Sequence, residues 1–472
     1  MHFSKTLCFF LALTTALLSL TACSPKAPAT SPVPPASDEP TVTFTGTNFA
    51  HCGLYTWDNV PSQYEFWKAC GVDTIQLSER LWYFSAADEE QYQKRIASFA
   101  SYIDRLHEAG FLVDVLFFSN LRQYKGEYEY DKDSGGIGVW FHPDDEEALN
   151  EKLYYTRMLM TACAKADYFT IEAGDPGGIT DRMGEGDEYD YAKLVEAFNE
   201  VAKECAPNVK VRANTWAVSA FKTPNISVHE LQWWINENEM TRNLLLKEDF
   251  FGEDLGLFIP CHDYYRPKLL KLYNQAVRIK QMEDFPLFPT VEDLQPLTDR
   301  DTEIWLWPFN LLGSDGNADY CASFTSSLRY VHRDVNAMRE LGADGIMADW
   351  TWKGYLGMAI NTYGYARFVN DPAATPEKVI DEYASYLTDG EGRAALAQIL
   401  RFIENKSRYD ASLPKTKRLP KLECTVTSAQ QALDLLGSVT PKASSDFPLP
   451  ENVDSIFARI KDRLNTLLDD GR

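Results

Sequence analysis

From residue 42 onward, short apolar runs alternate with longer stretches in which apolar residues recur every three or four positions. The short runs predict buried strands, and the longer stretches predict amphipathic helices. Strands are predicted at residues 42–49 with 53–57, then at 72–77, 111–118, 168–173, 209–215, 255–260, 303–307 and 345–348. Helices are predicted at residues 61–69, 88–109, 146–164, 191–205, 268–281 and 326–341.

Eight strand regions, most of them followed by a helical stretch, predict an α/β fold, the (β/α)8 TIM barrel. The alternative is an open doubly wound sheet, which is disfavoured because no Gly-x-Gly-x-x-Gly follows the first strand. After Pro372 the pattern is helical, with helices predicted at residues 376–387, 393–405, 428–436 and 453–468. We therefore expect the barrel over residues 41–370 and a C-terminal helical region over 371–472.

The N-terminal segment has the pattern of an exported leader. Lys5 precedes an apolar run that is too short to span a membrane comfortably, so residues 1–22 are predicted to be a signal peptide. The run ends in Leu20-Thr21-Ala22-Cys23, which resembles the lipobox of bacterial lipoproteins and implies acylation, such as palmitate, at Cys23. Residues 23–40 are rich in proline and predict an extended tether. We expect a lipid-anchored protein of the bacterial cell envelope, in the outer membrane of a Gram-negative cell.

Composition and charge narrow the class of protein. The chain is 45% hydrophobic and carries a net charge of −23, so we expect a globular protein that repels the phosphates of nucleic acids. Membrane contact is expected only through the lipid anchor. The seven cysteines that remain besides Cys8 and Cys23 form no Cys-x-x-Cys pair, and histidine is sparse. We therefore predict neither a metal site nor a cofactor.

Candidate chemistry follows the predicted strands, because the active site of such a barrel lies at the carboxyl ends of its strands. Carboxylates can transfer protons, Arg and Asn can bind hydroxyl or carboxylate groups, and Trp can stack on a sugar ring. This combination predicts an oligosaccharide or polysaccharide substrate. The residues predicted to bind it are Arg212, Asn214, Trp216, His262, Trp307, Asn310, Asp349, Trp350 and Trp352.

Cleavage of a glycosidic bond requires one protonated carboxyl and one ionised carboxylate on either side of the bond. Glu172 ends the fourth strand, and Asp175 follows in a turn rich in Gly and Pro, so either residue is a candidate general acid. Asp263, after the sixth strand, is the candidate base or nucleophile, and Asp349 is a further acid. Two structural alternatives stay open: an ion pair between Glu172 and Arg212, and a turn or helix cap at Asp175.

One segment is more specific. Asp349-Trp350-Thr351, Asn361-Thr362-Tyr363, Arg367, Asp371-Pro372 and Glu382-Tyr383 together resemble the C-terminal side of the α-glucuronidase family of glycoside hydrolases. The resemblance implies a barrel-type sugar hydrolase with its general acid in the turn that holds Asp175 and a base carboxylate at Asp263. It also implies that Asn310 stands where the family has a second base carboxylate.

These observations predict a surface-anchored, α-glucuronidase-like glycoside hydrolase. The alternative is a glycan-binding lipoprotein that has a hydrolase-like barrel but does not cleave its ligand. Asn310 favours this alternative, because it stands where the family has a carboxylate. A structural lipoprotein of the envelope is a third reading, which the charged and indole residues at the strand ends disfavour.

Overall fold

The computed structural model describes residues 48–56, 59–79, 89–121, 141–173, 187–216, 218, 231–247, 249–261, 288–308, 312, 327–350, 359–407 and 418–471. Phe44–Arg472 form one compact unit, and the description below concerns this unit. The predicted signal peptide, Cys23 and the tether lie outside the described residues. Among the described helices, none combines the length and the apolar character that a membrane span requires.

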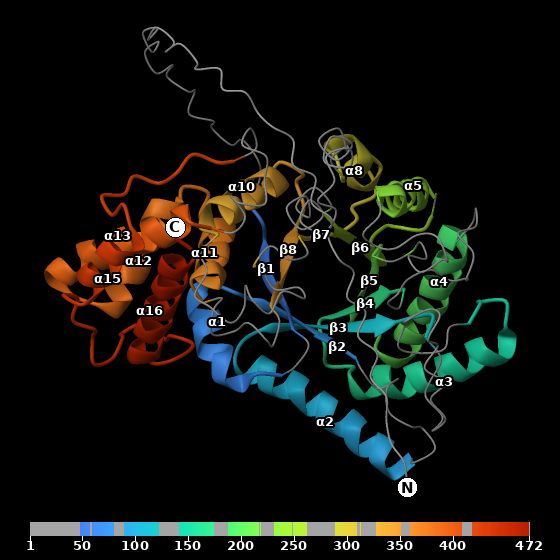
Figure 1. The fold of residues 1–472 in the computed structure, drawn as a ribbon. Coiled ribbons are helices and arrows are strands. Elements are labelled where there is room, and N and C mark those ends of the chain that lie inside the picture. Colours follow the sequence, from blue (N-terminus) through green and yellow to red (C-terminus); the bar gives the residue numbers. More distant parts are fainter. Residues whose placement is uncertain are drawn as a thin grey trace, which may run out of the picture. The chain divides into compact units, whose positions relative to one another are not determined.

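Eight parallel strands form a closed barrel that the helices surround (Figure 1). The strands are β1 (His51–Thr56), β2 (Thr74–Ser78), β3 (Leu112–Phe118), β4 (Tyr168–Glu172), β5 (Lys210–Asn214), β6 (Leu255–Pro260), β7 (Ile304–Trp307) and β8 (Gly345–Trp350). Strand β8 pairs with β1 from His51–Gly345 to Thr56–Trp350 and closes the ring. The predicted TIM barrel is therefore confirmed, and the open doubly wound sheet is wrong.

Helices follow the strands along the chain. The helices of the barrel region are α1 (Tyr64–Cys70, preceded by the 3-10 turn Pro61–Gln63), α2 (Glu89–Glu108), α3 (Glu146–Ala162), α4 (Asp187–Cys205), α5 (Leu231–Leu246), α8 (Val291–Thr298), α10 (Leu328–Arg339) and α11 (Ala359–Asn370). Their ends have local causes. Gly71 closes α1 with a positive φ of 99°, and Thr290 begins α8 in a capping box with Asp293. The helix predicted at 268–281 lies outside the described residues.

Among the described residues, the hydrophobic pattern missed three helices, for reasons that the structure explains. Helix α5 places Glu237, Asn238 and Thr241 on its buried side, which hides the apolar periodicity. Helix α8 contains Pro296, and α11 is buried on almost all sides, so its sequence has no polar stripe. A residue pattern identifies a helix only when one face is apolar and the other polar.

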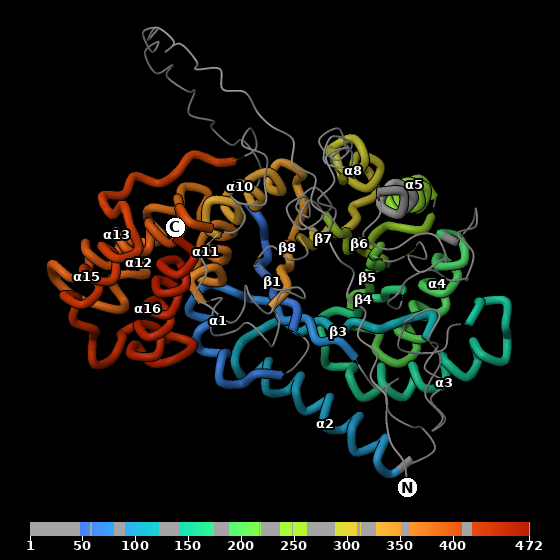
Figure 2. The backbone as a smooth tube through the Cα atoms, viewed as in Figure 1, coloured from blue at the N-terminus to red at the C-terminus, as the bar shows by residue number. Residues whose placement is uncertain are grey.

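The C-terminal helices are α12 (Pro376–Leu387), α13 (Gly390–Asn405), α15 (Ala429–Leu436) and α16 (Val453–Asp469). Helix α11 packs on α1, α10 and α12, so it joins the barrel to the C-terminal helices, which Figure 2 shows beside α10 and α11. Phe447 adds a second connection, because its ring lies against Phe66 of α1, Tyr363 of α11 and Tyr386 of α12.

Side chains alternate along each strand between the inside of the barrel and the surrounding helices. In β3, Val113, Val115 and Phe117 belong to the hydrophobic core under the helices. Asp114 points the other way, into the barrel, where it meets side chains of β2, β4 and β5. The inside of the barrel is therefore partly polar, and its polar side chains lie at particular heights along the barrel axis.

Candidate active site

Glu172 and Asn214 lie side by side at the carboxyl ends of β4 and β5, where Glu172 pairs with Asn214 in the strand register. The Asn214 side-chain amide donates a hydrogen bond to Glu172 Oε2. The Asn214 amide oxygen in turn accepts from the Trp216 backbone N–H at 2.9 Å. This second bond fixes which way the amide faces, so its Nδ2 is directed at the carboxylate.

The backbone around Glu172 is also held in place. The Ser119 backbone N–H and hydroxyl both donate to the Glu172 carbonyl oxygen, at 2.8 and 3.0 Å. The Tyr191 hydroxyl of α4 lies within hydrogen-bond distance of the carbonyl oxygens of Ile171 and Asn214, at 2.8 and 2.6 Å. Burial, together with the carboxylates of Glu172 and Glu237, holds the pKa of Tyr191 well above its ordinary value. The hydroxyl therefore stays protonated and available as a donor.

A second carboxylate reaches the same end of the barrel from β8. Asp349 is buried, and its Oδ1 accepts a hydrogen bond from the Trp307 indole N–H at 2.7 Å. Strands β4 and β8 are four positions apart in a closed ring of eight, so Glu172 and Asp349 stand on opposite sides of the mouth. Such an arrangement offers a carboxylate on each side of a bound molecule.

Aromatic rings gather around Trp307 at this mouth. Its ring centroid lies 5.9 Å from that of Tyr55 in β1, 5.7 Å from that of Trp216 after β5, and 5.9 Å from that of Phe258 in β6. Because β1 and β5 are not neighbours of β7, these rings meet inside the barrel. Indole and phenol faces next to carboxylates suit the apolar faces and hydroxyl groups of a sugar.

Arg212 requires a correction. The sequence predicted that it binds the substrate, but it lies two residues before Asn214 on the same face of β5, one level deeper in the barrel. Its Nη2 pairs with Asp114 Oδ2 at 2.5 Å, and its guanidinium lies over the rings of Tyr168 and Trp305, 4.1 and 4.4 Å from their centroids. Asp114, not Glu172, is the ion-pair partner that the structure gives to Arg212.

Trp350 requires a second correction. Its ring packs edge-to-face on Trp67 of α1, with the centroids 4.8 Å apart, and it is 1% exposed. The alternation along β8 explains this placement, because Asp349 points into the barrel and the next residue must point out. Trp350 therefore belongs to the packing between strand and helix and not to the mouth.

The other predicted residues divide into two groups. Asn214, Trp216, Trp307, Asp349 and Glu172 lie together at the carboxyl ends of the strands, and their roles toward a ligand stay predictions. The remaining candidates lie outside the described residues and also stay predictions: Asp175, Asp263, His262, Asn310 and Trp352.

Sequence reasoning missed several residues that shape this site. Ser119 and Tyr191 hold backbone carbonyls, and a serine or tyrosine in that role has no sequence signal. Asp114 did have one, since a single acid interrupts the otherwise apolar strand LVDVLFF. A charge in the middle of a buried strand requires a partner.

In the part of the chain that the structure describes, no cluster of His, Cys, Asp and Glu could hold a metal ion. The described cysteines, at positions 52, 70, 163, 205, 261 and 424, are all free thiols. Burial raises the pKa of Cys52 and Cys70 well above the ordinary thiol value, so both are unreactive at neutral pH.

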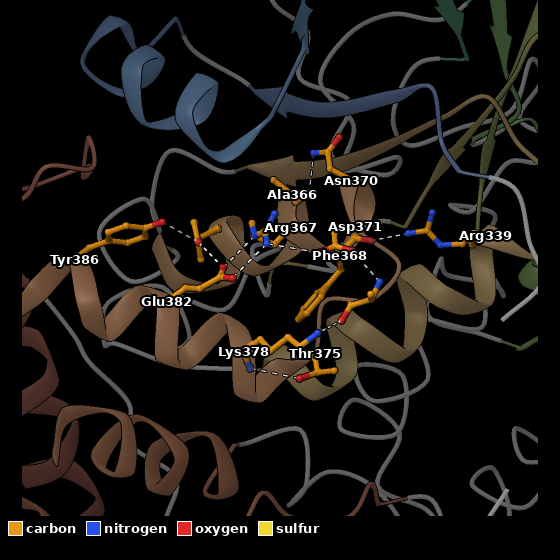
Figure 3. A network of polar contacts seen from close by, with 12 residues as sticks. Arg339, Ala366, Arg367, Phe368, Asn370, Asp371, Thr375, Lys378, Glu382 and Tyr386 are labelled. Carbon is orange, nitrogen blue, oxygen red and sulfur yellow. Dashed lines mark hydrogen bonds and ion pairs between the residues drawn. The ribbon is translucent and has the colours of Figure 1, made fainter. Parts of the chain in front are cut away.

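The segment that carries the α-glucuronidase resemblance lies mostly in α11 and α12, away from the strand ends that form the mouth. Figure 3 shows its polar contacts. Arg367 of α11 pairs with Glu382 of α12 at 3.1 Å and with Asp371 at 3.6 Å, and the Tyr363 hydroxyl donates to Glu382 at 2.8 Å. Asn361 accepts from the Ser327 backbone N–H at 3.0 Å. These residues hold α11 against α12 and the start of α10, so they build the scaffold.

Comparison with protein-family models gives no match, and comparison with curated proteins gives none either. Among solved structures, the chain is similar to an O-GlcNAc hydrolase from Thermobaculum terrenum, with 12% identity over 89% of this chain and 82% of that chain and a TM-score of 0.43. It is also similar to a GH5-4 broad specificity endoglucanase from an uncultured bacterium (9% identity, 70% and 98% coverage, TM-score 0.42). An endo-beta-1,4-mannanase from Thermotoga petrophila is a further neighbour (11%, 70% and 79%, TM-score 0.41). At identities and TM-scores this low, none of these proteins' activities transfers to this chain.

Proposed function

We propose that this protein is a glycoside hydrolase in which Glu172 is the general acid. The observation that carries the proposal is the fixed carboxylate of Glu172 at the carboxyl end of β4, with Asp349 on the opposite strand and indole rings at the same mouth. A buried carboxyl in such a place supports proton transfer to a leaving group.

The contact with Asn214 restricts where the proton can be. An amide N–H only donates, so Glu172 Oε2 accepts this hydrogen bond, and the contact favours Oε1 over Oε2 as the oxygen that carries a proton. We propose Glu172 Oε1 as the atom that protonates the glycosidic oxygen. Asp349 and the predicted Asp263 are the candidates for base or nucleophile, and Asp175 is the alternative acid.

Two finer parts of the proposal rest on the sequence. The segment around Asn361 and Glu382 supports an α-glucuronidase-like substrate, and the lipobox-like Cys23 with its proline-rich tether supports anchoring in the envelope. In a Cys23→Ser variant of the full chain, we expect the protein to move from the membrane fraction to the soluble fraction. A variant that stays in the membrane fraction would contradict the anchor.

Turnover of a panel of aryl glycosides, including an aryl α-glucuronide, and of oligosaccharides tests the catalytic proposal. We expect Glu172→Gln to lower kcat by about 10²–10⁴-fold, the usual contribution of a general acid. The loss should shrink on substrates with an acidic phenol leaving group, because these need no protonation. Glu423→Gln, an exposed change in the C-terminal region, is the control. Unchanged turnover in Glu172→Gln would refute the assignment.

The second candidate is a glycan-binding protein that does not cleave its ligand. Asn310, at the position that the resemblance assigns to a carboxylate, favours it. Wild-type protein that binds an oligosaccharide in calorimetry yet releases no product from any substrate of the panel would establish this alternative.

A further inference from the structure

One carboxylate joins four neighbouring strands below the candidate active site. Asp114 of β3 is fully buried and accepts hydrogen bonds from Gln76 of β2 at 2.6 Å, Thr170 of β4 at 2.8 Å and Arg212 of β5 at 2.5 Å. We call these four residues the Asp114 network. Its side-chain bonds add to the backbone ladder and fix how far each strand lies along its neighbours.

Stability alone does not account for this network. Arg212 and Asp114 have 1% and 0% exposed side chains, and a pair so deeply buried loses about as much in desolvation as it gains from attraction. Arg212 Nε and Nη1 have no hydrogen-bond partner among the described residues, which adds to the cost. Apolar side chains of similar volume would fill the barrel at equal stability. The network therefore contributes geometry, not net folding energy.

The geometry matters two residues further along the strands. Glu172 follows Thr170 on the inward face of β4, and Asn214 follows Arg212 on the inward face of β5. A strand rises about 3.3 Å per residue, so the contact between Glu172 and Asn214 lies roughly 7 Å above the Asp114 network. A relative slip of β4 and β5 by about 1 Å would tilt the hydrogen bond between Asn214 and Glu172 and displace the carboxylate, and a displacement of that size is costly for a catalytic group.

We propose that Asp114 and Arg212 are positioning residues for Glu172. They hold β4 and β5 at one relative height, so that Asn214 stays on Glu172 Oε2. Neither residue touches the substrate. The catalytic part of this inference rests on the proposed function, whereas the structural part does not.

The decisive variant replaces the whole network, with Asp114→Leu, Arg212→Met, Gln76→Leu and Thr170→Val, so that neither a charge nor the donors on Gln76 and Thr170 stay buried without a partner. We expect its melting temperature to stay close to that of the wild type while kcat falls by about tenfold or more, because small misplacements of a catalytic group are costly. In the pH–rate profile, the limb that belongs to Glu172 is the one that Glu172→Gln removes. This limb should move to higher pH in the variant, because the Glu172 carboxylate loses the hydrogen bond from Asn214, which favours its charged form. Leu116→Met, also inside the barrel, is the matched control and should change neither quantity.

Backbone hydrogen exchange gives a readout that does not depend on activity. The Trp216 N–H is bonded to Asn214 Oδ1, so the network variant should exchange this proton about tenfold faster while global stability is unchanged. Wild-type protein without turnover would refute the proposed function, and the exchange rate would still decide the positioning role. If the network variant does not fold, Thr170→Val alone removes one donor to Asp114 without a change of charge and should speed the same exchange. Unaltered exchange at Trp216 in the variant that folds would overturn the inference.

Discussion

Two buried arginine–carboxylate pairs hold different parts of this molecule, and they are built differently. Arg212–Asp114 lies inside the barrel, and Arg329–Glu404 lies between α10 and the C-terminal helix α13. Asp114 accepts hydrogen bonds from side chains. Glu404 also accepts from the backbone N–H groups of Leu328 and Arg329, at 2.9 and 3.1 Å.

The surroundings of the two guanidinium groups differ as well. Arg329 donates to the carbonyl oxygens of Leu419, Pro420 and Glu404, at 2.9 to 3.1 Å. Arg212 lies over the rings of Tyr168 and Trp305 and has two nitrogens without a partner among the described residues. The pair in the barrel can be replaced by apolar groups together with its side-chain donors Gln76 and Thr170, whereas Glu404 satisfies backbone N–H groups, which no substitution can remove.

The start of α10 depends on this remote carboxylate because the helix has no cap of its own. The N-cap residue Ser327 makes no side-chain capping bond. Glu404, from 76 positions along the chain, takes that role at the positive end of the helix. Helix α13 of the C-terminal region thereby caps the start of α10, a helix of the barrel.

The largest expected effect is that of Glu404→Ala. It leaves Arg329 without its carboxylate and two backbone N–H groups without acceptors, so we expect a loss of about 3–5 kcal/mol in the free energy of unfolding. Urea unfolding measures it. Glu423→Ala, at an exposed position of the same region, should change stability by less than about 0.5 kcal/mol. Equal stability of the two variants would show that the cap contributes nothing.

Paired apolar replacements sharpen the comparison. Replacement of the whole Asp114 network, with Asp114→Leu, Arg212→Met, Gln76→Leu and Thr170→Val, should be close to the wild type in stability. Glu404→Leu with Arg329→Met should stay about 1–3 kcal/mol less stable, because the N–H groups of α10 are still buried without an acceptor. Both variants are compared by urea unfolding under one set of conditions. The distinction between the pairs fails if the two variants lose the same free energy.

A smaller effect should come from giving α10 a local cap. Ser327→Asp introduced into the Glu404→Ala variant places a carboxylate at the N-cap, where Asp usually stabilises a helix by about 0.5–2 kcal/mol. We expect partial recovery of stability and slower exchange of the Leu328 amide proton. The same substitution in the wild type should give little, because Glu404 already occupies that end. Recovery of equal size in both backgrounds would argue against a shared role.

Much of the fold was predictable because strands and helices have distinct periods. The bounds of β6 and α12 match the predicted residues, and β7 begins one residue later than predicted. The height of a side chain along the barrel axis, and the residue that it meets there, were not predictable. Alternation gives the face on which Arg212 lies, but residue order does not say that its carboxylate partner stands two strands away.

Small errors in strand length had larger consequences at the candidate site. The predicted eighth strand stopped at residue 348, whereas β8 continues to Trp350. Asp349 is therefore a strand residue that points inward, and Trp350 is one that points out toward Trp67. The acid at the mouth was recognisable from its place near the strand end. The role of Asn214 toward Glu172 was not, because it depends on contact between two strands.

The smallest expected effect belongs to a pair that water reaches, at the amino end of the barrel. His51 and Asp73 are 3.2 Å apart with side chains 27% and 35% exposed, and the imidazole stacks on Trp305. The hydrogen bond to Asp73 is the main reason that the pKa of His51 is raised above 6.5, against the opposing effect of burial. Because the folded-state value is the higher one, this stabilisation is complete below about pH 6.5 and is lost as the pH rises through the folded-state pKa.

The size of this effect should be below about 1 kcal/mol, as for other pairs open to solvent. Urea unfolding of wild type and His51→Gln at several values between pH 5.5 and pH 8.5 measures it. The difference in stability between the two proteins should shrink as the pH rises. The buried pairs should show no such dependence over this range, because Arg212 and Arg329 keep their charge. A constant difference for His51→Gln would mean that the imidazole contributes by stacking on Trp305 and not by its charge.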